Sequence, residues 1–536
     1  MPFRVLVTDD IDPDGVALLV ADPRLQVDEV PTLPKEELYE RIGEYDAIIG
    51  RSATRISEEL LRRATKLKVV GRAGVGVDNI ALDVATKLGV AVINAPAGNT
   101  IAVAELFFGC VLGLLRHVPR ADSSMHAGRW DRADLLGSEL KGRTLGIVGL
   151  GRIGGEIASR AHAFCMEVVA FDPYVADARF QTMRVRRAPS LDALVAEADI
   201  LTVHTPLTDE TEGMIGRGEL ARLPAGAIVC NLARGGIIAE DALLAALDGG
   251  KLAGAVLDVY TKEPLKGEHA FRERANVLLT PHIGASTAEA QRNVAVDACR
   301  AVRDALVSGE LSRSINIAQT AENDWGDLQP ALFVAQRAAA VARAILADQG
   351  VKAVQRVSVR CGPELAGGHG VIAAAAAVGV LEGVLETERL NLISARALAE
   401  ARGIELAVTE SAQLGHPAAV EISLAAGMRE VAVAGVAARG TPARLTRIGG
   451  FHVDVTPRHT LIVLTNHDVP GVIGRVGTLL GSASVNIAEY HQARLAQGGE
   501  ALAAITVDSP VGPELRKQLL ELPDVLTATI VRFRDS

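Results

Sequence analysis

The chain is poor in cysteine and in aromatic residues, and its acidic side chains outnumber its basic ones. Its five cysteines are scattered among 536 residues, odd in number and never spaced as CxxC. This usage argues against a disulfide framework or a zinc site, so we expect no metal and predict buried thiols in a reducing cytoplasm. The formal net charge of −10 argues against nucleic acid or an anionic membrane as a partner.

A secretion signal and a long apolar run are also missing from the pattern. The sequence opens with MPFRVLVTDD, which has no basic-then-apolar signal. The longest apolar runs, Ile101–Leu115 and Gly370–Leu381, look too short to span a bilayer. We therefore expect a soluble cytoplasmic protein. Hydrophobic residues make up 49% of the chain, and its length predicts three or four domains.

The most informative segment is TLGIVGLGRIG, residues 144–154. It begins as the apolar strand Thr144–Val148, and the helical stretch Glu156–Phe164 follows it. Between them, Gly149, Gly151 and Gly154 have G-x-G-x-x-G spacing. The first glycine permits a tight turn, the second a close approach to a pyrophosphate, and the third helix–strand packing. The phosphates would lie on N–H groups at the helix start, so the segment predicts a dinucleotide site.

The identity of the dinucleotide follows from the next strand, Glu167–Phe171, which ends in Asp172. Asp172 comes 18 residues after Gly154, where an acid that binds the ribose hydroxyls is expected. A carboxylate there repels a 2′-phosphate, so NAD is favoured over NADP. Three nearby arginines come too late in the chain to change this: Arg184, Arg186 and Arg187.

Residues 1–97 alternate short apolar strands with helical patterns, which predicts a parallel sheet covered on both faces. The expected strands are Phe3–Thr8, Val27–Val30, Asp46–Gly50, Lys68–Arg72 and Ala91–Asn94. Ligands of such sheets bind at the carboxyl ends of the strands. Arg51 and Arg72 lie at those ends, beside glycines. They form either an anion cradle for an acidic substrate or ordinary solvated arginines, and spacing alone favours neither.

Four later strands also end in polar residues: they run into His204-Thr205-Pro206, LARGG, LDVYTKEP and Pro281-His282. Arg234 could hold a substrate carboxylate or keto oxygen through two hydrogen bonds. Glu263 and His282 could form a carboxylate–imidazole pair that takes a proton from an alcohol. Asp258 is expected near the nicotinamide carboxamide. Each residue alone is more often structural, but together at one sheet edge they indicate hydride-transfer chemistry.

The remaining segments bear on domain organisation. A long apolar helix is expected over Ile101–His117, buried between domains. The polar stretch Ala121–Leu140 is either a subunit-contact arm, with Trp130 and Arg132, or a surface loop. The helix Thr287–Val307 could return the chain to the first domain. Residues 313–452 show no catalytic cluster, and residues 459–536 have βαββαβ order, typical of an effector or dimerisation module.

These motifs resemble those of the D-isomer-specific 2-hydroxy-acid dehydrogenases. The resemblance rests on GLGRIG with Asp172, on LARGG, on LDVYTKEP and on PHIGAST; GRSATR, GRAGVGVDN and the tail are similar to the family's long form. It implies an α/β fold with two doubly wound, Rossmann-like domains, an α+β intervening domain and a ferredoxin-like ACT domain. The implied boundaries are 1–97 with 286–312 (substrate-binding, discontinuous), 98–285 (NAD-binding), 313–452 (intervening, regulatory) and 459–536 (ACT).

The resemblance also implies site residues. The catalytic set is Arg234, Glu263 and His282. The cofactor-binding set is Val75, Gly149, Gly151, Arg152, Ile153, Gly154, Asp172, Thr205, Leu232, Ala233, Arg234, Asp258, His282, Gly284 and Ala285. The substrate-binding set is Arg51, Ser52, Arg72 and Arg132, with Arg132 reaching a neighbouring subunit's site. An L-serine effector would bind Asn466, Asp468 and Asn486 at a subunit interface.

The implied activity is oxidation of a small phosphorylated 2-hydroxy acid, 3-phospho-D-glycerate, by NAD, the entry to L-serine biosynthesis. The implied assembly is a homo-oligomer, a dimer or a tetramer. A glyoxylate or hydroxypyruvate reductase would share the catalytic trio. So would a non-catalytic NADH-sensing protein. The first-domain arginines and the effector-type tail favour the phosphoglycerate oxidation.

Overall fold

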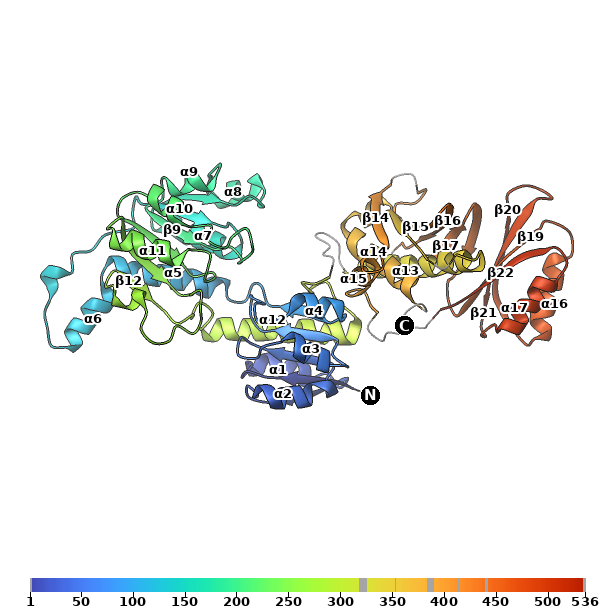
Figure 1. Cartoon of the computed structure of the whole chain (residues 1–536), viewed down its shortest axis with the longest axis horizontal. Coiled ribbons are helices and arrows are strands. Elements are labelled where there is room, and N and C mark those ends of the chain that lie inside the picture. The colour runs from blue at the N-terminus through green and yellow to red at the C-terminus, as the bar shows by residue number, and fades with distance from the viewer. Residues whose placement is uncertain are drawn as a thin grey trace.

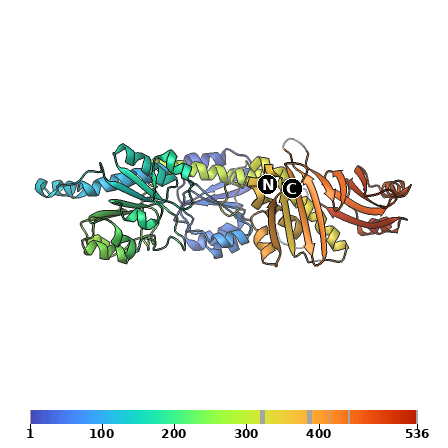
Figure 2. The same ribbon diagram turned by 90° about the horizontal axis from the view of Figure 1, so that it is seen from above.

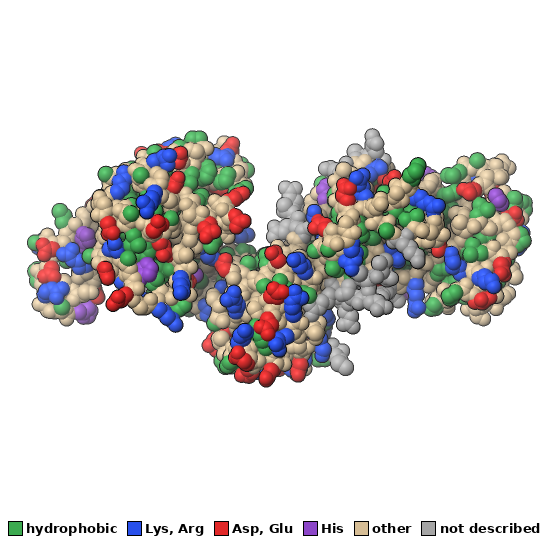
Figure 3. Space-filling view, in the orientation of Figure 1, with side chains coloured by type: hydrophobic (Ala, Val, Ile, Leu, Met, Phe, Trp, Pro, Cys, Tyr) green, Lys and Arg blue, Asp and Glu red, His purple; other side chains and the backbone are tan. Residues whose placement is uncertain are grey.

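The computed structural model describes residues 2–317, 325–351, 353–382, 390–411, 414–438 and 442–533. Four β-sheets with their helices are arranged along an elongated molecule in the order second, first, third and fourth (Figure 1). Seen from above, the same order holds, with the first two sheets on one side and the last two on the other (Figure 2). On the face drawn in Figure 3, acidic and basic side chains interleave and form no large area of one sign.

The first sheet is five-stranded and parallel, in the order β2-β1-β3-β4-β5. Its strands are β1 (Phe3–Val7), β2 (Leu25–Glu29), β3 (Ala47–Gly50), β4 (Val69–Arg72) and β5 (Ala91–Asn94). One face is covered by α2 (Lys35–Arg41), α3 (Glu58–Arg63) and α4 (Leu82–Lys87). The other is covered by α1 (Pro13–Val20) and α12 (Ala288–Ser308). We call this unit the first lobe.

Helix α12 comes from much later in the chain than the sheet that it covers. It begins where Thr287 accepts a hydrogen bond from the Ala290 N–H, and it ends at Gly309 in the left-handed region. A Cβ at Gly15 of α1 would lie 2.7 Å from the Ala295 carbonyl carbon, so the two helices pack closely only because position 15 is glycine. The first lobe is therefore built from two separate parts of the chain.

The second sheet has seven parallel strands in the order β12-β11-β10-β9-β6-β7-β8. They are β6 (Thr144–Val148), β7 (Glu167–Phe171), β8 (Arg186–Arg187), β9 (Ile200–Val203), β10 (Ala227–Asn231), β11 (Leu252–Leu257) and β12 (Val277–Leu279). The chain starts at β6, runs outward to β8 and returns at β9. The strand order thus reverses between β6 and β9, and ligands of such sheets bind at that point.

Helices cover both faces of this sheet as well. On one face lie α5 (Thr100–Leu115) and α7 (Arg152–Ala163), and α8 (Asp177–Met183) follows β7. On the other lie α9 (Leu191–Val195), α10 (Arg217–Arg222) and α11 (Glu240–Asp248). We call this unit the second lobe. The predicted pair of doubly wound parallel sheets is confirmed.

The third sheet is six-stranded and mixed, in the order β14-β13-β15-β16-β17-β18. Its strands are β13 (Arg356–Cys361), β14 (Glu405–Glu410), β15 (Ala419–Ala426), β16 (Arg429–Val436), β17 (Arg444–Ile448) and β18 (Phe451–Val455). Its helices are α13 (Trp325–Asp348), α14 (His369–Leu381) and α15 (Ala395–Glu400). Buried alanines and valines of α13 and α14 join the apolar side chains of the sheet in one core.

Two helical segments here, Trp325–Asp348 and Pro363–Leu381, are long and apolar enough to cross a membrane by length and composition. The bent pair Thr100–Leu115 and Val118–His126 would make a third. The sequence expectation concerned the shorter runs Ile101–Leu115 and Gly370–Leu381, and the helical segments that contain or continue these runs are longer. In the third unit, 61% and 72% of the two apolar windows are buried inside the protein, as expected for core helices.

The fourth sheet is four-stranded and antiparallel, in the order β20-β21-β19-β22. The elements are β19 (Thr460–His467), α16 (Val472–Ser482), β20 (Ile487–Arg494), β21 (Glu500–Val507), α17 (Pro513–Glu521) and β22 (Val525–Arg532). This is the βαββαβ order predicted from the sequence. Val476 and Leu480 of α16 and Leu519 of α17 pack on the sheet, so the two helices cover the same face.

Candidate active site

A cavity of about 420 Å³ opens between the two lobes. The first lobe contributes the loop after β4, and the second lobe contributes loops at the carboxyl ends of its strands. Eleven of the residues predicted for the site line this cavity: Val75, Arg152, Ile153, Thr205, Leu232, Ala233, Arg234, Asp258, His282, Gly284 and Ala285. As predicted from the strand ends, the fold brings together side chains that are far apart in the sequence.

The glycine turn has the geometry that a dinucleotide needs. Gly149 has a φ of +94°, and a Cβ there would lie 2.7 Å from the His204 carbonyl oxygen. A Cβ at Gly154 would lie 2.1 Å from the Gly149 carbonyl oxygen. At Gly151, which precedes α7, a Cβ would meet nothing within 4 Å. The first and third glycines are thus required by packing, and the second faces open space at a helix N-terminus.

Asp172 is held against this turn by two backbone donors. Its Oδ2 accepts from the Leu150 N–H at 2.9 Å, and its Oδ1 accepts from the Tyr174 N–H at 2.9 Å. The neighbouring arginines are engaged with acids, because Arg186 pairs with Glu197 and Arg187 with Asp177. The carboxylate is therefore fixed beside the phosphate turn, while Arg187, besides its ion pair with Asp177, donates from Nη2 to the Asp172 carbonyl at 3.4 Å.

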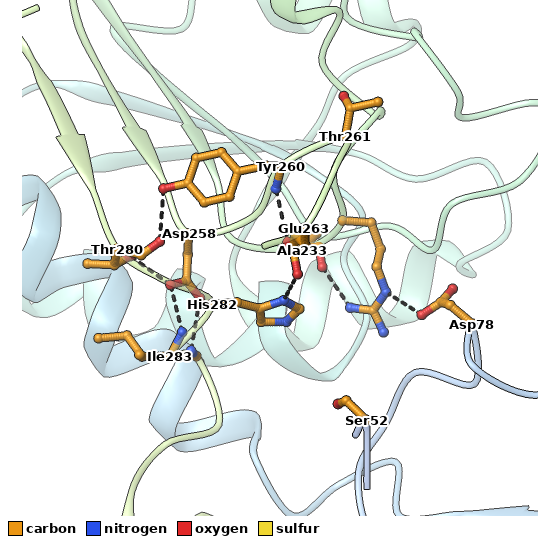
Figure 4. Close-up of polar contacts among 12 residues, drawn as sticks. Ser52, Asp78, Ala233, Asp258, Tyr260, Thr261, Glu263, Thr280, His282 and Ile283 are labelled. Carbon is orange, nitrogen blue, oxygen red and sulfur yellow. Dashed lines mark hydrogen bonds and ion pairs between the residues drawn. The ribbon is translucent and has the colours of Figure 1, made fainter. Parts of the chain in front are cut away.

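Asp258 organises the loop that carries the histidine. Its side chain is buried, with Oδ1 accepting from the Thr280 hydroxyl at 2.6 Å and the Ile283 N–H at 2.8 Å, and Oδ2 accepting from the Gly284 N–H at 2.9 Å (Figure 4). These three bonds hold the loop on both sides of His282. The residue therefore supports the loop as well as lining the cavity.

His282 and Glu263 form the predicted carboxylate–imidazole pair. The Nδ1 of His282 lies 2.7 Å from Glu263 Oε2, and Glu263 Oε1 accepts from the Tyr260 N–H at 3.0 Å (Figure 4). The histidine has a φ of +55°, an uncommon conformation for a residue with a side chain. A backbone in this region at a cavity wall fits a residue whose orientation matters for function.

Arg234 also lines the cavity and lies in the LARGG loop after β10. Asn231 is buried below it and holds the loop, donating to the Arg234 carbonyl at 2.8 Å and accepting from the Ala233 N–H at 3.1 Å. A Cβ at Gly235 would lie 1.9 Å from the Tyr260 carbonyl oxygen, so the loop needs glycine there. The Nε of Arg234 donates to Asp78 Oδ2 at 3.1 Å across the cavity.

The first-lobe arginines Arg51 and Arg72 lie near Arg234, although neither lines the cavity itself. Arg72 donates from Nη2 to the Ser52 hydroxyl at 2.7 Å, and Arg51 donates from Nη1 to Gln291 Oε1 of α12 at 3.0 Å. Burial, together with the nearby guanidinium groups of Arg234 and Arg51, lowers the pKa of Arg72 to about 10. Three guanidinium groups from two lobes are therefore close enough to repel one another, which favours an anion between them.

Arg132, the remaining predicted substrate contact, lies on a separate part of the second lobe. It is in a short helix, Arg132–Asp134, on an arm that projects from the second lobe with α6 (Val118–His126) (Figure 1). Trp130 and Leu136 of this arm are 78% and 90% exposed. The sequence predicted one helix up to residue 117, but α5 ends at Leu115 and a left-handed His117 starts a second helix. Arg132 does not reach the cavity of its own chain.

The predicted effector residues lie on the fourth sheet, in two groups. Asn466 and Asp468 are at the end of β19, whereas Asn486 precedes β20. Along β21, Asn466 pairs with Ala501 and Ile487 with Val507, so the groups lie about 20 Å apart at the usual rise of a strand. Asp468 pairs with Arg494 at 3.1 Å, and Asn486 donates to Asp508 at 2.6 Å. One chain does not bring the three residues together.

Four residues of the site were not singled out from the sequence. Asp78 and Gln291 contact Arg234 and Arg51 from other parts of the chain, and Asn231 holds the arginine loop. His204 lines the cavity, and burial lowers its pKa to about 3. Asn231 and His204 could have been found from the sequence, because Asn231 is the last residue of β10 and His204 directly follows β9. No sequence pattern pointed to Asp78 and Gln291, because their hydrogen-bond partners lie in distant segments of the chain.

Comparisons with known proteins agree with this geometry. A family model described as D-isomer specific 2-hydroxyacid dehydrogenase, NAD binding domain, matches residues 108–284. The D-3-phosphoglycerate dehydrogenase of Archaeoglobus fulgidus is 36% identical over 99% of this chain and 100% of its own. That of Bacillus subtilis is 36% identical over 99% of both chains. The similarity to curated proteins thus spans all four sheets.

Solved structures match the two lobes. A glyoxylate reductase from Paecilomyes thermophila is 30% identical, with a TM-score of 0.54 over 59% of this chain and 98% of its own. A 3-phosphoglycerate dehydrogenase from Entamoeba histolytica, solved with NAD⁺ bound, is 27% identical, with a TM-score of 0.50 over 59% of this chain and 99% of its own. These neighbours include both enzyme classes considered from the sequence.

Proposed function

The chain belongs to the D-3-phosphoglycerate dehydrogenase family, and on that premise we propose that it oxidises 3-phospho-D-glycerate to 3-phosphooxypyruvate with NAD, the first step of L-serine biosynthesis. The observation that carries the proposal is a single cavity between two lobes. Its walls include Arg234, residues 152–153 of the glycine turn and His282, which is paired with Glu263; the guanidinium groups of Arg51 and Arg72 lie close to Arg234. That combination supplies a base, anion-binding groups and a hydride acceptor site.

The residues present fit NAD. The open space over Gly151 and the helix N-terminus behind it would take the pyrophosphate. Asp172 would accept hydrogen bonds from the ribose hydroxyls. The Thr205 hydroxyl is buried and finds no hydrogen-bond partner among the residues that the structure describes, so a polar ligand group is needed beside it. Arg152, Ile153, Leu232, Ala233, Gly284 and Ala285 would contact the rest, with Val75 beside the nicotinamide.

His282 would act as the general base. Because its Nδ1 is bonded to Glu263, Nε2 is the nitrogen that can take the substrate hydroxyl proton. Glu263 would orient the ring and stabilise the imidazolium that forms. When bound, NAD supplies the acceptor for the hydride that leaves C2. The imidazolium would return its proton in the reverse direction, to the keto oxygen of the product.

The arginines would hold the two ends of the substrate. We assign the carboxylate end to Arg234, whose planar group suits two parallel hydrogen bonds. Arg51 and Arg72, with Ser52, would hold the phosphate, and Arg132 would come from the arm of a second copy. The lowered pKa of Arg72, to about 10, supports this assignment, since an anion relieves the repulsion from Arg234 and Arg51.

A glyoxylate or hydroxypyruvate reductase is the nearest alternative, because such an enzyme also has this two-lobed fold. A non-catalytic NADH-binding protein is a more distant one. A steady-state assay with NAD and phosphorylated or unphosphorylated 2-hydroxy acids separates all three. Preference for the phosphorylated acid supports the proposal. Preference for glyoxylate or hydroxypyruvate with NADH supports the reductase, and NADH binding without turnover supports the sensor.

For the domains, we propose the boundaries given from the sequence: 1–97 with 286–312, 98–285, 313–452 and 459–536. The packing of α12 on the first sheet supports the discontinuous first domain. The βαββαβ order of the last unit supports an ACT domain, and with it allosteric control. A soluble protein is consistent with the burial of the apolar helices. We propose that it works in the cytoplasm.

For the effector, we propose an L-serine site formed between two copies of the chain. The separation of Asn466 and Asp468 from Asn486 supports this, because two copies are needed to combine them. The exposed arm with Trp130 supports a second subunit contact, and two different contacts would build a homotetramer. Sedimentation and a serine titration of the activity test both statements.

A further inference from the structure

Arg234 already forms an ion pair with a carboxylate of the protein itself, the side chain of Asp78. Its Nε donates to Asp78 Oδ2 at 3.1 Å. Asp78 lies in the loop after β4 of the first lobe, whereas Arg234 follows β10 of the second, 156 residues away in sequence. The ion pair therefore crosses the cavity and joins the two lobes (Figure 4).

The loop is shaped for this contact. A Cβ at Gly76 would lie 1.9 Å from Arg234 Nη2 and 2.8 Å from Asp78 Oδ2. A side chain at position 76 would thus push the guanidinium away, and glycine lets the pair form. Asp78 also acts against the repulsion among the arginines, because its charge raises the pKa of Arg72 while Arg234 and Arg51 lower it.

We infer that Asp78 is an internal competitor for the substrate carboxylate, occupying Arg234 until substrate displaces it. The inference rests on the proposed role of Arg234. The side chain of Asp78 is 67% exposed, so it can turn into water when a ligand carboxylate arrives. Once displaced, it returns to Arg234 as product leaves. It is a positioning residue that weakens ground-state binding and aids release, and it takes no part in proton or hydride transfer.

The test is Asp78→Asn, which keeps the size of the side chain and removes its charge. Asp83→Asn is the matched control, since Asp83 is exposed on α4 of the same lobe and the change in net charge is equal. Calorimetry of 3-phospho-D-glycerate with the NADH-loaded enzyme gives the dissociation constant. For Asp78→Asn we expect a value about two- to fivefold lower, the size of an exposed ion pair, and no change for Asp83→Asn.

Three further readouts distinguish competition from a structural role. The dissociation constant of D-glycerate should fall by the same factor, because each carboxylate meets the same competitor. Asp78→Glu should restore the wild-type value. In an Arg234→Gln background, Asp78→Asn should change nothing, since the contested group is gone. An unchanged or weaker affinity in Asp78→Asn, at an unaltered melting temperature, would overturn the inference. Absence of phosphoglycerate turnover by the wild-type enzyme would instead overturn the proposed function.

Discussion

The Nδ1 of His282 lies 2.7 Å from Glu263 Oε2, although the two residues belong to different loops of the second lobe. The contact fixes which ring nitrogen is committed to the protein and leaves Nε2 for the substrate. The loop of Glu263 also carries Asp258, and the loop after β10 brings Arg234 to the same cavity wall. The arrangement assigns a separate task to each side chain, and each task can be tested by substitution.

Replacing His282 by Ala should lower kcat by about a hundredfold to ten-thousandfold, the usual contribution of a positioned general base. NADH affinity should change little, because the dinucleotide is held mainly by the glycine turn. Stopped-flow turnover and NADH fluorescence titration check the two expectations. His452→Ala, at an exposed site on β18, is the control. Equal losses of turnover and NADH affinity would contradict the assigned role.

Replacing Asp172 by Ala should weaken NAD by about ten- to a hundredfold, the value of hydrogen bonds to a charged group. It should also reduce the discrimination against NADP, because the carboxylate no longer repels a 2′-phosphate. The measurement is kcat/KM with each dinucleotide, with Asp192→Ala on α9 as the control. If NAD affinity stays as in the wild type, Asp172 does not bind the ribose.

Arg72 presents a conflict between stability and function. Its pKa is lowered to about 10 by burial and by the nearby arginines. The group is still charged at neutral pH, but keeping that charge in the fold costs stability, and this cost shrinks as pH rises from about 10 towards the ordinary value of 12.5. Arg72→Met should therefore keep or raise the melting temperature of the ligand-free protein. It should raise the KM for 3-phospho-D-glycerate by about ten- to a hundredfold. A lower melting temperature with unchanged KM would assign Arg72 a purely structural role.

Because of His204, we expect the stability of the folded protein to depend on pH in the acid range. Burial lowers its pKa to about 3, so the unfolded chain binds a proton below pH 6.5 that the folded chain does not. Stability is therefore lost as pH falls from about 6.5 towards 3, by at most about 1.4 kcal/mol per pH unit from this group. His204→Asn removes that contribution. Urea unfolding at pH 6.5 and pH 5 should show the variant losing less stability than the wild type, and parallel losses would refute the assignment.

How much of the site could be predicted from the sequence depends on whether each contact joins residues that are near or far apart in the chain. The glycine turn and Asp172 are local in sequence, and the parallel-sheet rule placed Glu263, Arg234 and His282 at one edge. The Asp78–Arg234 and Arg51–Gln291 contacts join residues 156 and 240 positions apart. No periodicity encodes them, because they depend on how two lobes are juxtaposed. Arg132 and the effector residues are a different case, since their predicted partners lie on a second copy.

The central claim is that the cavity selects a phosphorylated 2-hydroxy acid. The most direct measurement compares kcat/KM for 3-phospho-D-glycerate and for D-glycerate, with NAD at saturation. The first-lobe arginines predict a preference for the phosphorylated acid of about a hundredfold or more, as two charged contacts would give. Equal values, or a preference for D-glycerate, would contradict the account.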